Sequence, residues 1–153
     1  MSSLELKVPP PVVAAAFAAA MWGVSVAWPT ASFELADAKL LGIFLASLGL
    51  LVAAAGILAF RAHHTTVNPR RPAATSTVVT TGIFARTRNP MYLGLALVLL
   101  GWSVFLRHPA SMLVVGAFIA YITEFQIKPE ERVLAAKFGE PFARYKAAVR
   151  RWL

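Results

Sequence analysis

The chain has 153 residues, of which 58% are hydrophobic and 14% are charged. Soluble domains carry about 45–50% apolar and about 25% charged residues, and a chain this small cannot hide so much apolar surface in one core. The hydrophobic content also excludes a disordered chain. The absence of cysteine excludes disulfides, zinc–thiolate sites, iron–sulfur clusters and cysteine nucleophiles. In so apolar a chain, the net charge of +8 indicates basic loops beside a membrane. The composition therefore predicts a small integral membrane protein.

Four apolar stretches predict an all-α, multi-pass transmembrane helical bundle of about four spans, at residues 11–28, 39–60, 91–106 and 110–127. A helix crosses a bilayer with about 20 residues, within a range of roughly 17–25. The second stretch meets this length comfortably and the first and fourth adequately. The third is short, so we expect either a locally thinned membrane or a helix packed inside the bundle.

The first span is also compatible with a cleavable signal peptide, although it lacks a strongly basic leading region and a further span follows it.

Only Arg107, His108 and Pro109 join the third span to the fourth. So short a link forces these two spans into an antiparallel hairpin.

Lysine and arginine are unevenly placed along the chain. Five lie between Arg61 and Arg88 and seven between Lys128 and Arg151, whereas each of the two remaining links carries one. By the positive-inside rule, the loop at residues 61–90, the C-terminal tail and hence the N-terminus face the cytoplasm. The size of the chain and its lack of cysteine are compatible with a prokaryotic cell membrane.

Two segments lie outside the predicted spans. Residues 61–90 are rich in Thr, Pro, Asn and Gly, which is loop composition. Residues 129–153 form a tail in which apolar side chains recur at helical intervals; they are Leu134, Phe138, Phe142, Tyr145, Val149 and Trp152. Because Gly139-Glu140-Pro141 interrupts this pattern, we expect two short amphipathic helices lying along the cytoplasmic face.

The first candidate for chemistry is the start of the third span. Pro90 fits the first turn of a helix, with Asn89 as its N-cap. Arg88 adds positive charge where the helix amide groups are unpaired, which suits a carboxylate or a phosphate. The same residues are equally compatible with an ordinary helix start, in which Arg88 only sets the topology.

The second candidate is Lys128-Pro129-Glu130-Glu131-Arg132, directly after the fourth span. Adjacent carboxylates can bind a cation, an amine or sugar hydroxyls, or they can simply begin a helix whose dipole favours acidic residues. Because spans three and four form a hairpin, their cytoplasmic ends meet. We therefore expect the two acidic residues to lie near Arg88.

Glu124 and the pair His63 and His64 are further candidates for chemistry. Glu124 lies inside the fourth span, where an acidic residue is costly and is by default a functional candidate. Alternatively, it is close enough to the interface to be simply hydrated. His63 and His64 follow the second span without a third ligand at helical spacing, so the sequence predicts no metal site.

The polar segments also carry a resemblance to a known family. The segments that carry it are Gly82-Ile83-Phe84, Arg88-Asn89-Pro90-Met91-Tyr92-Leu93-Gly94, Glu130-Glu131, Phe138-Gly139 and Tyr145. Together they resemble the membrane methyltransferases, which comprise the isoprenylcysteine carboxyl methyltransferases and the related phospholipid N-methyltransferases. The resemblance covers residues 65–153. Isoprenylcysteine enzymes commonly have His at the position of Asn89, whereas phospholipid methyltransferases can show Asn-Pro-Met-Tyr there.

The resemblance implies a site for S-adenosylmethionine at the start of span three, the end of span four and the tail. Arg88 and the helix N-terminus would take the carboxylate of the cofactor, and Glu130 or Glu131 its ammonium or ribose hydroxyls. Tyr92 would pack on the cofactor, and Gly94 would permit a close approach of backbone or cofactor. The implied cofactor-binding residues are Arg88, Asn89, Pro90, Tyr92, Gly94, Glu130 and Glu131.

The implied reaction moves a methyl group to a lipophilic acceptor that enters from the bilayer. The acceptor is an isoprenylcysteine-type carboxylate, a phospholipid amine or a small thiol. A carboxylate or thiolate needs no general base, whereas an amine or a thiol needs one, for which Glu124, Glu130 and Tyr121 are candidates.

The alternative to an enzyme is a non-catalytic membrane bundle, either a transporter subunit or a scaffold. It accounts for the hydrophobicity and the topology without a cofactor. Nucleic-acid binding is not expected, because the basic residues flank the spans and suit anionic membrane lipids. The sequence does not define an oligomeric state.

Overall fold

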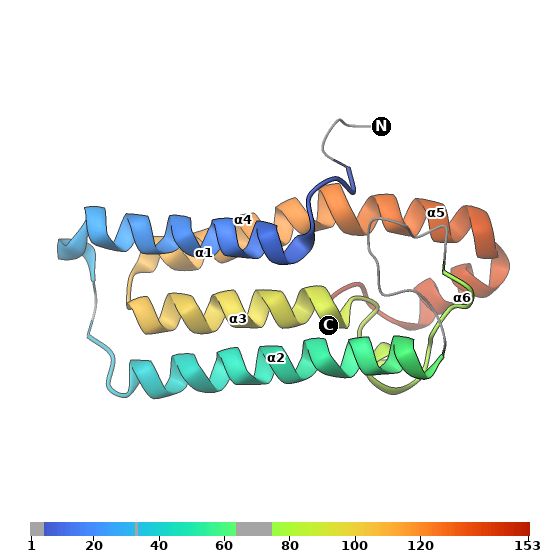
Figure 1. Ribbon diagram of the computed structural model, residues 1–153, viewed down its shortest axis with the longest axis horizontal. Helices are drawn as coiled ribbons and strands as arrows, with labels where there is room; N and C mark the ends of the chain where they lie inside the picture. Colours follow the sequence, from blue (N-terminus) through green and yellow to red (C-terminus); the bar gives the residue numbers. More distant parts are fainter. Residues whose placement is uncertain (1–4, 33, 64–74) are drawn as a thin grey trace.

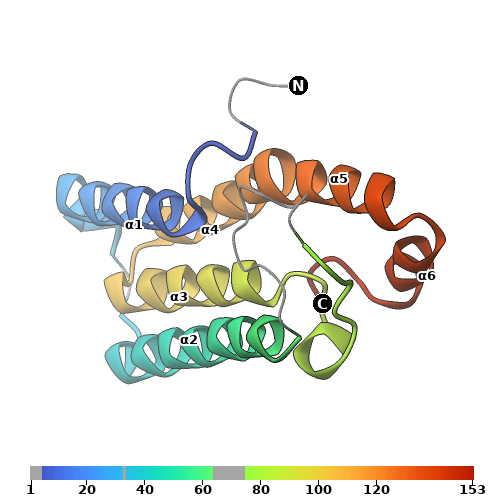
Figure 2. The same ribbon diagram turned by 45° about the vertical axis from the view of Figure 1, so that its right-hand side comes forward.

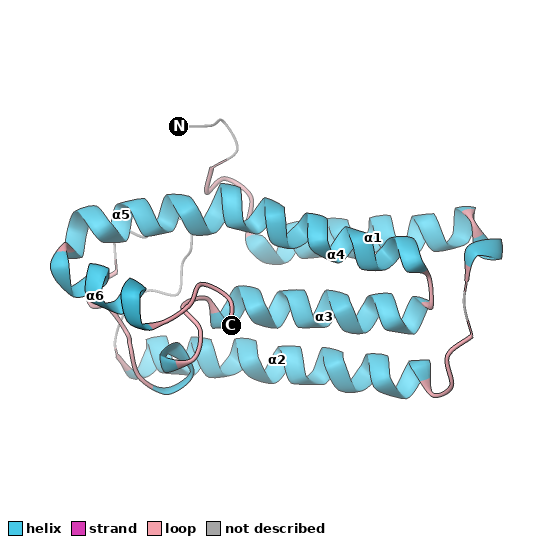
Figure 3. Ribbon diagram, turned by 180° about the vertical axis from the view of Figure 1, so that it is seen from behind, coloured by secondary structure: helices cyan, strands magenta, loops and turns pink. Residues whose placement is uncertain are grey.

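A computed structural model describes residues 5–32, 34–63 and 75–153. These residues form helices and no strand, which confirms the all-α prediction (Figure 3). The main helices are α1 (Pro10–Ala27), α2 (Ala38–Ala62), α3 (Pro90–Leu106), α4 (Pro109–Ile122), α5 (Lys128–Phe138) and α6 (Glu140–Ala148). Most of the predicted loop's first half, including His64, lies outside the described residues.

Three helical runs are long and apolar enough to cross a membrane. They are α1 with 18 residues, α2 with 25, and the continuous run Pro109–Phe138 with 30. The apolar part of the last run ends at Ile127, and the charged α5 lies beyond it. Helix α3 has only 17 residues. It packs against α1, α2 and α4 and buries one side chain or more in every turn, as expected for a short span inside a bundle.

The four long helices run antiparallel (Figure 1). The third and fourth form the predicted hairpin, with the short link after Leu106. Consequently α5, α6, the start of α3 and the end of α2 gather at one end of the bundle, here called the tail end (Figures 1 and 2). The links from α1 to α2 and from α3 to α4 lie at the opposite end, here called the turn end.

Helices α2 and α3 pack through a seam of glycines. Gly42, Gly49 and Gly56 recur every seven residues on α2, and Gly94 and Gly101 face the first two from α3. A β-carbon at Gly49 would lie 2.5 Å from the Gly94 carbonyl oxygen, and one at Gly101 would lie 2.5 Å from the Gly42 oxygen. Small residues of this kind let two backbones touch, which is how helices associate in membranes.

Helix α3 meets α1 and α4 in a different way, through large interlocking side chains. Met21, Leu99, Phe118 and Ile122 are fully buried there, and the rings of Phe17 and Phe118 meet edge to face at 5.6 Å. Glycine contact on one side and side-chain packing on the other hold α3 at the centre of the bundle.

The junction between α4 and α5 departs from the sequence prediction. The first tail helix does not lie along the surface but continues α4 through a π-helical segment, Thr123–Ile127. Pro129 has no N–H to donate to the Phe125 carbonyl and its ring would crowd that carbonyl. The wider π turn accommodates the ring, and the Leu6 N–H donates to the freed Phe125 oxygen at 3.1 Å. Proline therefore reshapes this helix without ending it.

The second half of the tail follows the prediction. The chain breaks at Gly139, whose φ of 56° is accessible mainly to glycine. Helix α6 then folds back toward the start of α3 (Figure 2). Phe142 and Tyr145 on its apolar face are buried, so this face packs against the protein.

Candidate active site

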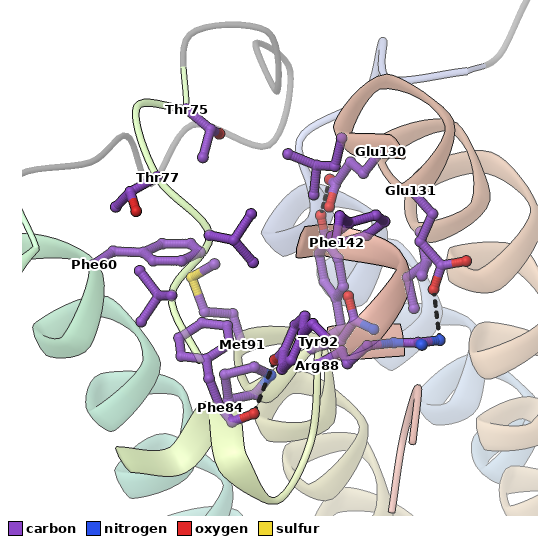
Figure 4. A pocket seen from close by; sticks show the side chains of 17 residues that line it. Phe60, Thr75, Thr77, Phe84, Arg88, Met91, Tyr92, Glu130, Glu131 and Phe142 are labelled. Atoms are coloured by element: carbon purple, nitrogen blue, oxygen red, sulfur yellow. Dashed lines mark hydrogen bonds and ion pairs between the residues drawn. The ribbon is translucent and has the colours of Figure 1, made fainter. Parts of the chain in front are cut away.

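A pocket opens at the tail end, between the end of α2, the start of α3, α5 and α6 (Figure 4). It encloses about 810 Å³ of empty space, including its open mouth. The apolar residues of its lining include Phe60, Val79, Phe84, Met91 and Leu134 and are here called the apolar wall. The charged residues of the lining, together with Tyr92, are Arg88, Glu130 and Glu131, and these four are here called the polar wall.

Arg88 and Glu131 form the centre of the polar wall. Arg88 Nη2 donates to Glu131 Oε1 at 2.9 Å, and the two side chains are 9% and 11% exposed. The second Glu131 oxygen accepts from Arg151 Nη2 at 2.8 Å. Although burial alone would raise the pKa of Glu131, the hydrogen bonds from Arg151 and the charges of Arg88 and Arg151 hold it below its ordinary value. Glu131 is thus a carboxylate between two guanidinium groups.

Arg88 also reaches the tail through Nη1, which donates to the Lys146 carbonyl oxygen at 2.9 Å. Its Nε is buried and has no hydrogen-bond partner among the described residues. An unpaired buried donor is costly, and Arg88 is one of the residues that line the pocket.

Glu130 and Tyr92 form the second part of the polar wall. The Tyr92 hydroxyl donates to Glu130 Oε1. Burial raises the pKa of Glu130 to about 8, although the hydrogen bond from Tyr92 works against this rise. The negative charge of Glu131 adds to the rise. The two adjacent glutamates therefore differ in protonation: Glu130 holds a proton near neutral pH, whereas Glu131 is ionised.

The structure brings together the two clusters that the hairpin predicted to be neighbours. Asn89 precedes α3 with Pro90 in its first turn, but the Asn89 side chain does not cap the helix. Instead its Nδ2 donates to the Arg151 carbonyl oxygen at 2.9 Å, because the end of the tail lies within reach. Asn89 is therefore the N-cap residue of α3, as predicted, but its side chain contacts the tail and makes no capping hydrogen bond.

Gly94 lies outside the pocket. It belongs to the glycine seam, where an added β-carbon would meet the Gly49 oxygen at 2.5 Å and Ala53 at 2.7 Å. Gly94 was expected to permit a close approach of either backbone or cofactor, and the structure shows the backbone of α2 there.

The two candidate bases in the fourth span are not at the pocket. The Glu124 side chain is 55% exposed and pairs with Lys128 one turn later. Tyr121 packs on the rings of Phe17 and Phe125, at 6.1 and 4.8 Å. His63 is exposed and contacts Thr81 Oγ1. No group of residues suited to a metal ion occurs in the described parts of the chain.

The structure adds residues that sequence reasoning missed. Arg151 is one, because nothing in a pair of tail arginines signals a partner 20 residues earlier. The aromatic contacts are another: Phe60 and Phe84 stack at 4.8 Å, and the Tyr145 hydroxyl donates to the Phe84 carbonyl oxygen at 2.8 Å. The apolar periodicity of the tail signalled that Tyr145 is buried but not what it contacts.

Over its described residues the protein is all-helical, with three helices long and apolar enough to cross a membrane and a pocket of mixed polarity at one end of the bundle. Residues 38–141 match the phospholipid methyltransferase family, and the chain belongs to this family. The matched range includes the four polar-wall residues and stops before Arg151. The family implies a methyltransferase that works in a membrane.

One relative and the absence of structural matches complete the comparison. The chain is 49% identical over 63 residues to an uncharacterized protein of Haemophilus influenzae. The alignment covers 41% of this chain and 100% of that protein. No solved structure matches the chain.

Proposed function

We propose that this protein transfers a methyl group from S-adenosylmethionine to a lipophilic acceptor at the cytoplasmic side of a membrane. The carrying observation is the division of one pocket into a polar and an apolar wall. A polar, charged cofactor and an acceptor with an alkyl chain need opposite surroundings. This pocket offers both within the same cavity.

The polar wall fits the charged groups of S-adenosylmethionine. The unpaired Arg88 Nε can donate to the cofactor carboxylate. Glu131 holds the guanidinium of Arg88 in place, so its role is to position that donor. Glu130 remains for the ammonium or a ribose hydroxyl. The bound cofactor supplies an already activated methyl group, and the protein's part is to orient the acceptor and exclude water.

The apolar wall fits the acceptor. Phe60 lies in the last turn of α2, so this wall is continuous with a helix whose outer face is apolar. The outer face of α2 carries exposed large apolar residues, including Leu50, Leu51 and Leu58. An acceptor with an alkyl chain can therefore reach the pocket from the lipid without crossing water. A phospholipid amine and an isoprenylcysteine-type carboxylate both have such a chain.

The placement of basic residues supports a cytoplasmic pocket. The tail end carries Arg61, Arg86, Arg88 and the seven basic residues from Lys128 to Arg151, whereas the turn end carries Lys39 and Arg107. The positive-inside rule assigns the more basic end to the cytoplasm, where S-adenosylmethionine is available.

Calorimetric titration with S-adenosylmethionine and S-adenosylhomocysteine, first in detergent and then in lipid nanodiscs, tests this function. We expect saturable binding at one site, lost in Glu131→Gln and retained in Glu140→Gln, which changes an exposed acid of α6. Transfer of a labelled methyl group to a phospholipid or to a prenylated cysteine would then identify the acceptor. No binding in either medium would leave a non-catalytic bundle.

A further inference from the structure

The junction between α4 and α5 sets which side of α5 faces the pocket. The buried face of α4 consists of Ser111, Val115, Phe118 and Ile122. In a regular α-helix, with about 3.6 residues in each turn, this face would continue at residues 126, 129 and 133. Beyond α4, however, the pocket is lined one residue later. The lining residues there are Ile127, Glu130 and Leu134, together with Glu131.

The π-helical segment Thr123–Ile127 produces this shift of one residue. A π turn takes one residue more than an α turn, because its hydrogen bonds join residues i and i+5. Every later residue is therefore rotated by about 100°, the angle of one residue in an α-helix. The rotation places Ile127 in the same buried core cluster as Ile122. It also turns Glu130 and Glu131 toward the pocket.

Residues 5–8, which precede α1 and are here called the N-terminal strap, lie beside this π turn (Figure 1). The Leu6 N–H donates to the Phe125 carbonyl oxygen at 3.1 Å, which is the carbonyl that Pro129 cannot serve. Leu6 has a φ of 57°, a conformation that leucine rarely adopts. The contacts of the strap, and not the preference of this residue, therefore fix its conformation.

Gln126 makes the second contact with the strap, from within the π turn. Its side chain is fully buried, and its Nε2 donates to the Val8 carbonyl oxygen at 2.8 Å. Farther along the helix, Arg132 Nη2 donates to Glu5 Oε2 at 2.6 Å. The strap thus contacts both the π turn and α5.

These contacts select the π turn from the alternatives that the sequence leaves open. Pro129 excludes a regular α turn here, but it does not by itself choose a π turn, because a proline can also kink a helix. Without the strap, the Phe125 carbonyl oxygen and the Gln126 amide would lose their partners among the described residues. A kinked helix would then compete with the π turn, and α5 would no longer keep one rotation.

We propose that Gln126 and the N-terminal strap are positioning elements of the methyl-transfer site, which fix the rotation of α5 and thereby keep Glu130 and Glu131 in the pocket. Neither Gln126 nor the strap is among the residues that line the pocket, so they act through the two glutamates. The inference rests on the proposed function only for the ligand whose affinity it predicts.

The rotation of α5 can be measured without any ligand. The chain has no cysteine, so Leu113→Cys on α4 and Ala136→Cys on α5, both at exposed positions, can carry a pair of spin labels. Pulsed electron paramagnetic resonance should give one narrow distance in the parent protein. Gln126→Leu combined with Leu6→Pro should add a broader population. Its distance should differ by up to roughly 8 Å, the displacement of a helix surface that turns by about 100°.

The affinity for S-adenosylmethionine, measured by calorimetry, should follow these populations. Only molecules that keep the parent rotation bind, so the affinity falls in proportion to their fraction. We expect about a tenfold loss in Gln126→Leu and a larger one with Leu6→Pro added. Leu6→Pro alone changes no fully buried side chain and keeps the test open if Gln126→Leu does not fold. Ser103→Ala, the matched control, removes a buried hydrogen bond from α3 and should change neither readout.

A rescue separates the rotation from a general loss of stability. Deletion of Glu124, an exposed residue of the π turn, combined with Pro129→Ala permits a regular α-helix in which α5 keeps the parent rotation, because one residue less replaces the π turn by an α turn. The new N–H at position 129 would then serve the Phe125 carbonyl oxygen. In this background, Leu6→Pro should change neither the distance nor the affinity.

The outcomes separate this inference from the proposed function. A parent distance and a parent affinity in the variant that combines Gln126→Leu with Leu6→Pro would overturn the inference. A distance and an affinity that do not change together would overturn it as well, since the strap would then not act through the rotation. Shifted distances in a protein that binds S-adenosylmethionine in no form would retain the control of rotation and reject the proposed function.

Discussion

The two ends of the bundle are built from the same four helices but with opposite chemistry. The ion pairs of the described residues all lie at the tail end. At the turn end the main polar contact is that of His108, a buried side chain whose Nε2 meets the Trp28 carbonyl oxygen at 3.1 Å. The contact at the turn end links neighbouring helices, whereas the tail end contains the pocket. Ligand binding and stability are therefore expected to respond to different substitutions.

The largest effect is expected where the two ends are joined, in the glycine seam. Gly94→Val would place side-chain atoms against the Gly49 backbone, which cannot move without parting α2 from α3. We expect no folded protein, measured as loss of the monodisperse peak in size-exclusion chromatography. Gly116→Val is the control, because a β-carbon there meets nothing within 4 Å. Normal folding of Gly94→Val would show that the seam is looser than its distances indicate.

The next largest effect belongs to the tail end. Arg88→Ala removes the unpaired Nε and leaves Glu131 with one guanidinium partner. We expect about a 100-fold loss of affinity for S-adenosylmethionine, since a charge-assisted hydrogen bond contributes about 1.5–3 kcal/mol. The melting temperature should fall as well, because the substitution breaks a buried ion pair. Arg86→Ala, at an exposed position two residues earlier, should retain the parent affinity.

The turn end should give the reverse result. His108→Ala removes a buried ring and leaves the Trp28 carbonyl without its partner. We expect a destabilisation of about 1–3 kcal/mol, seen as a lower midpoint in thermal unfolding, with S-adenosylmethionine affinity unchanged within about twofold. A large loss of affinity would mean that the two ends are coupled.

The smallest effect separates two neighbours within the tail. The carbonyl of Arg150 accepts from the Arg88 N–H at 3.1 Å while its side chain is exposed, so Arg150→Ala should leave cofactor affinity unchanged and only weaken contact with anionic lipid. Arg151→Ala removes a partner of Glu131 and should lower the affinity about tenfold. Titrations of the two variants in nanodiscs measure the difference. Equal affinities would remove Arg151 from the site.

The parts of the fold that could be predicted are those governed by local pattern. Hydropathy located the spans, the short link at His108 fixed the hairpin, and the hairpin brought Arg88 toward Glu130 and Glu131. The break at Gly139 followed from residue type alone. Each of these features is determined by a few consecutive residues, so it can be predicted from the sequence alone.

The parts that could not be predicted depend on contacts between distant segments. Pro129 is read as the start of a helix, and only the distant Leu6 N–H shows how the helix continues past it. Asn89 lies at the N-cap position of α3, but its side chain donates to the Arg151 carbonyl oxygen instead of capping the helix. Glu124 looks costly inside a span, yet it is exposed beside Lys128. For Pro129 and Asn89 a partner outside the local window decided the outcome, whereas Lys128 lies only one turn from Glu124.

Because α5 follows α4 in the chain, the apolar helices are completed before the polar wall during synthesis. Arg88 and Tyr92 are synthesised early, but Glu130, Glu131 and Arg151 all follow the last apolar residues. A ribosome therefore completes every span before it produces the residues that close the polar wall. The Leu6 amide is likewise made long before its acceptor, the Phe125 carbonyl. A chain that stops at Ile127 would contain all four apolar helices but lack Glu130, Glu131 and Arg151.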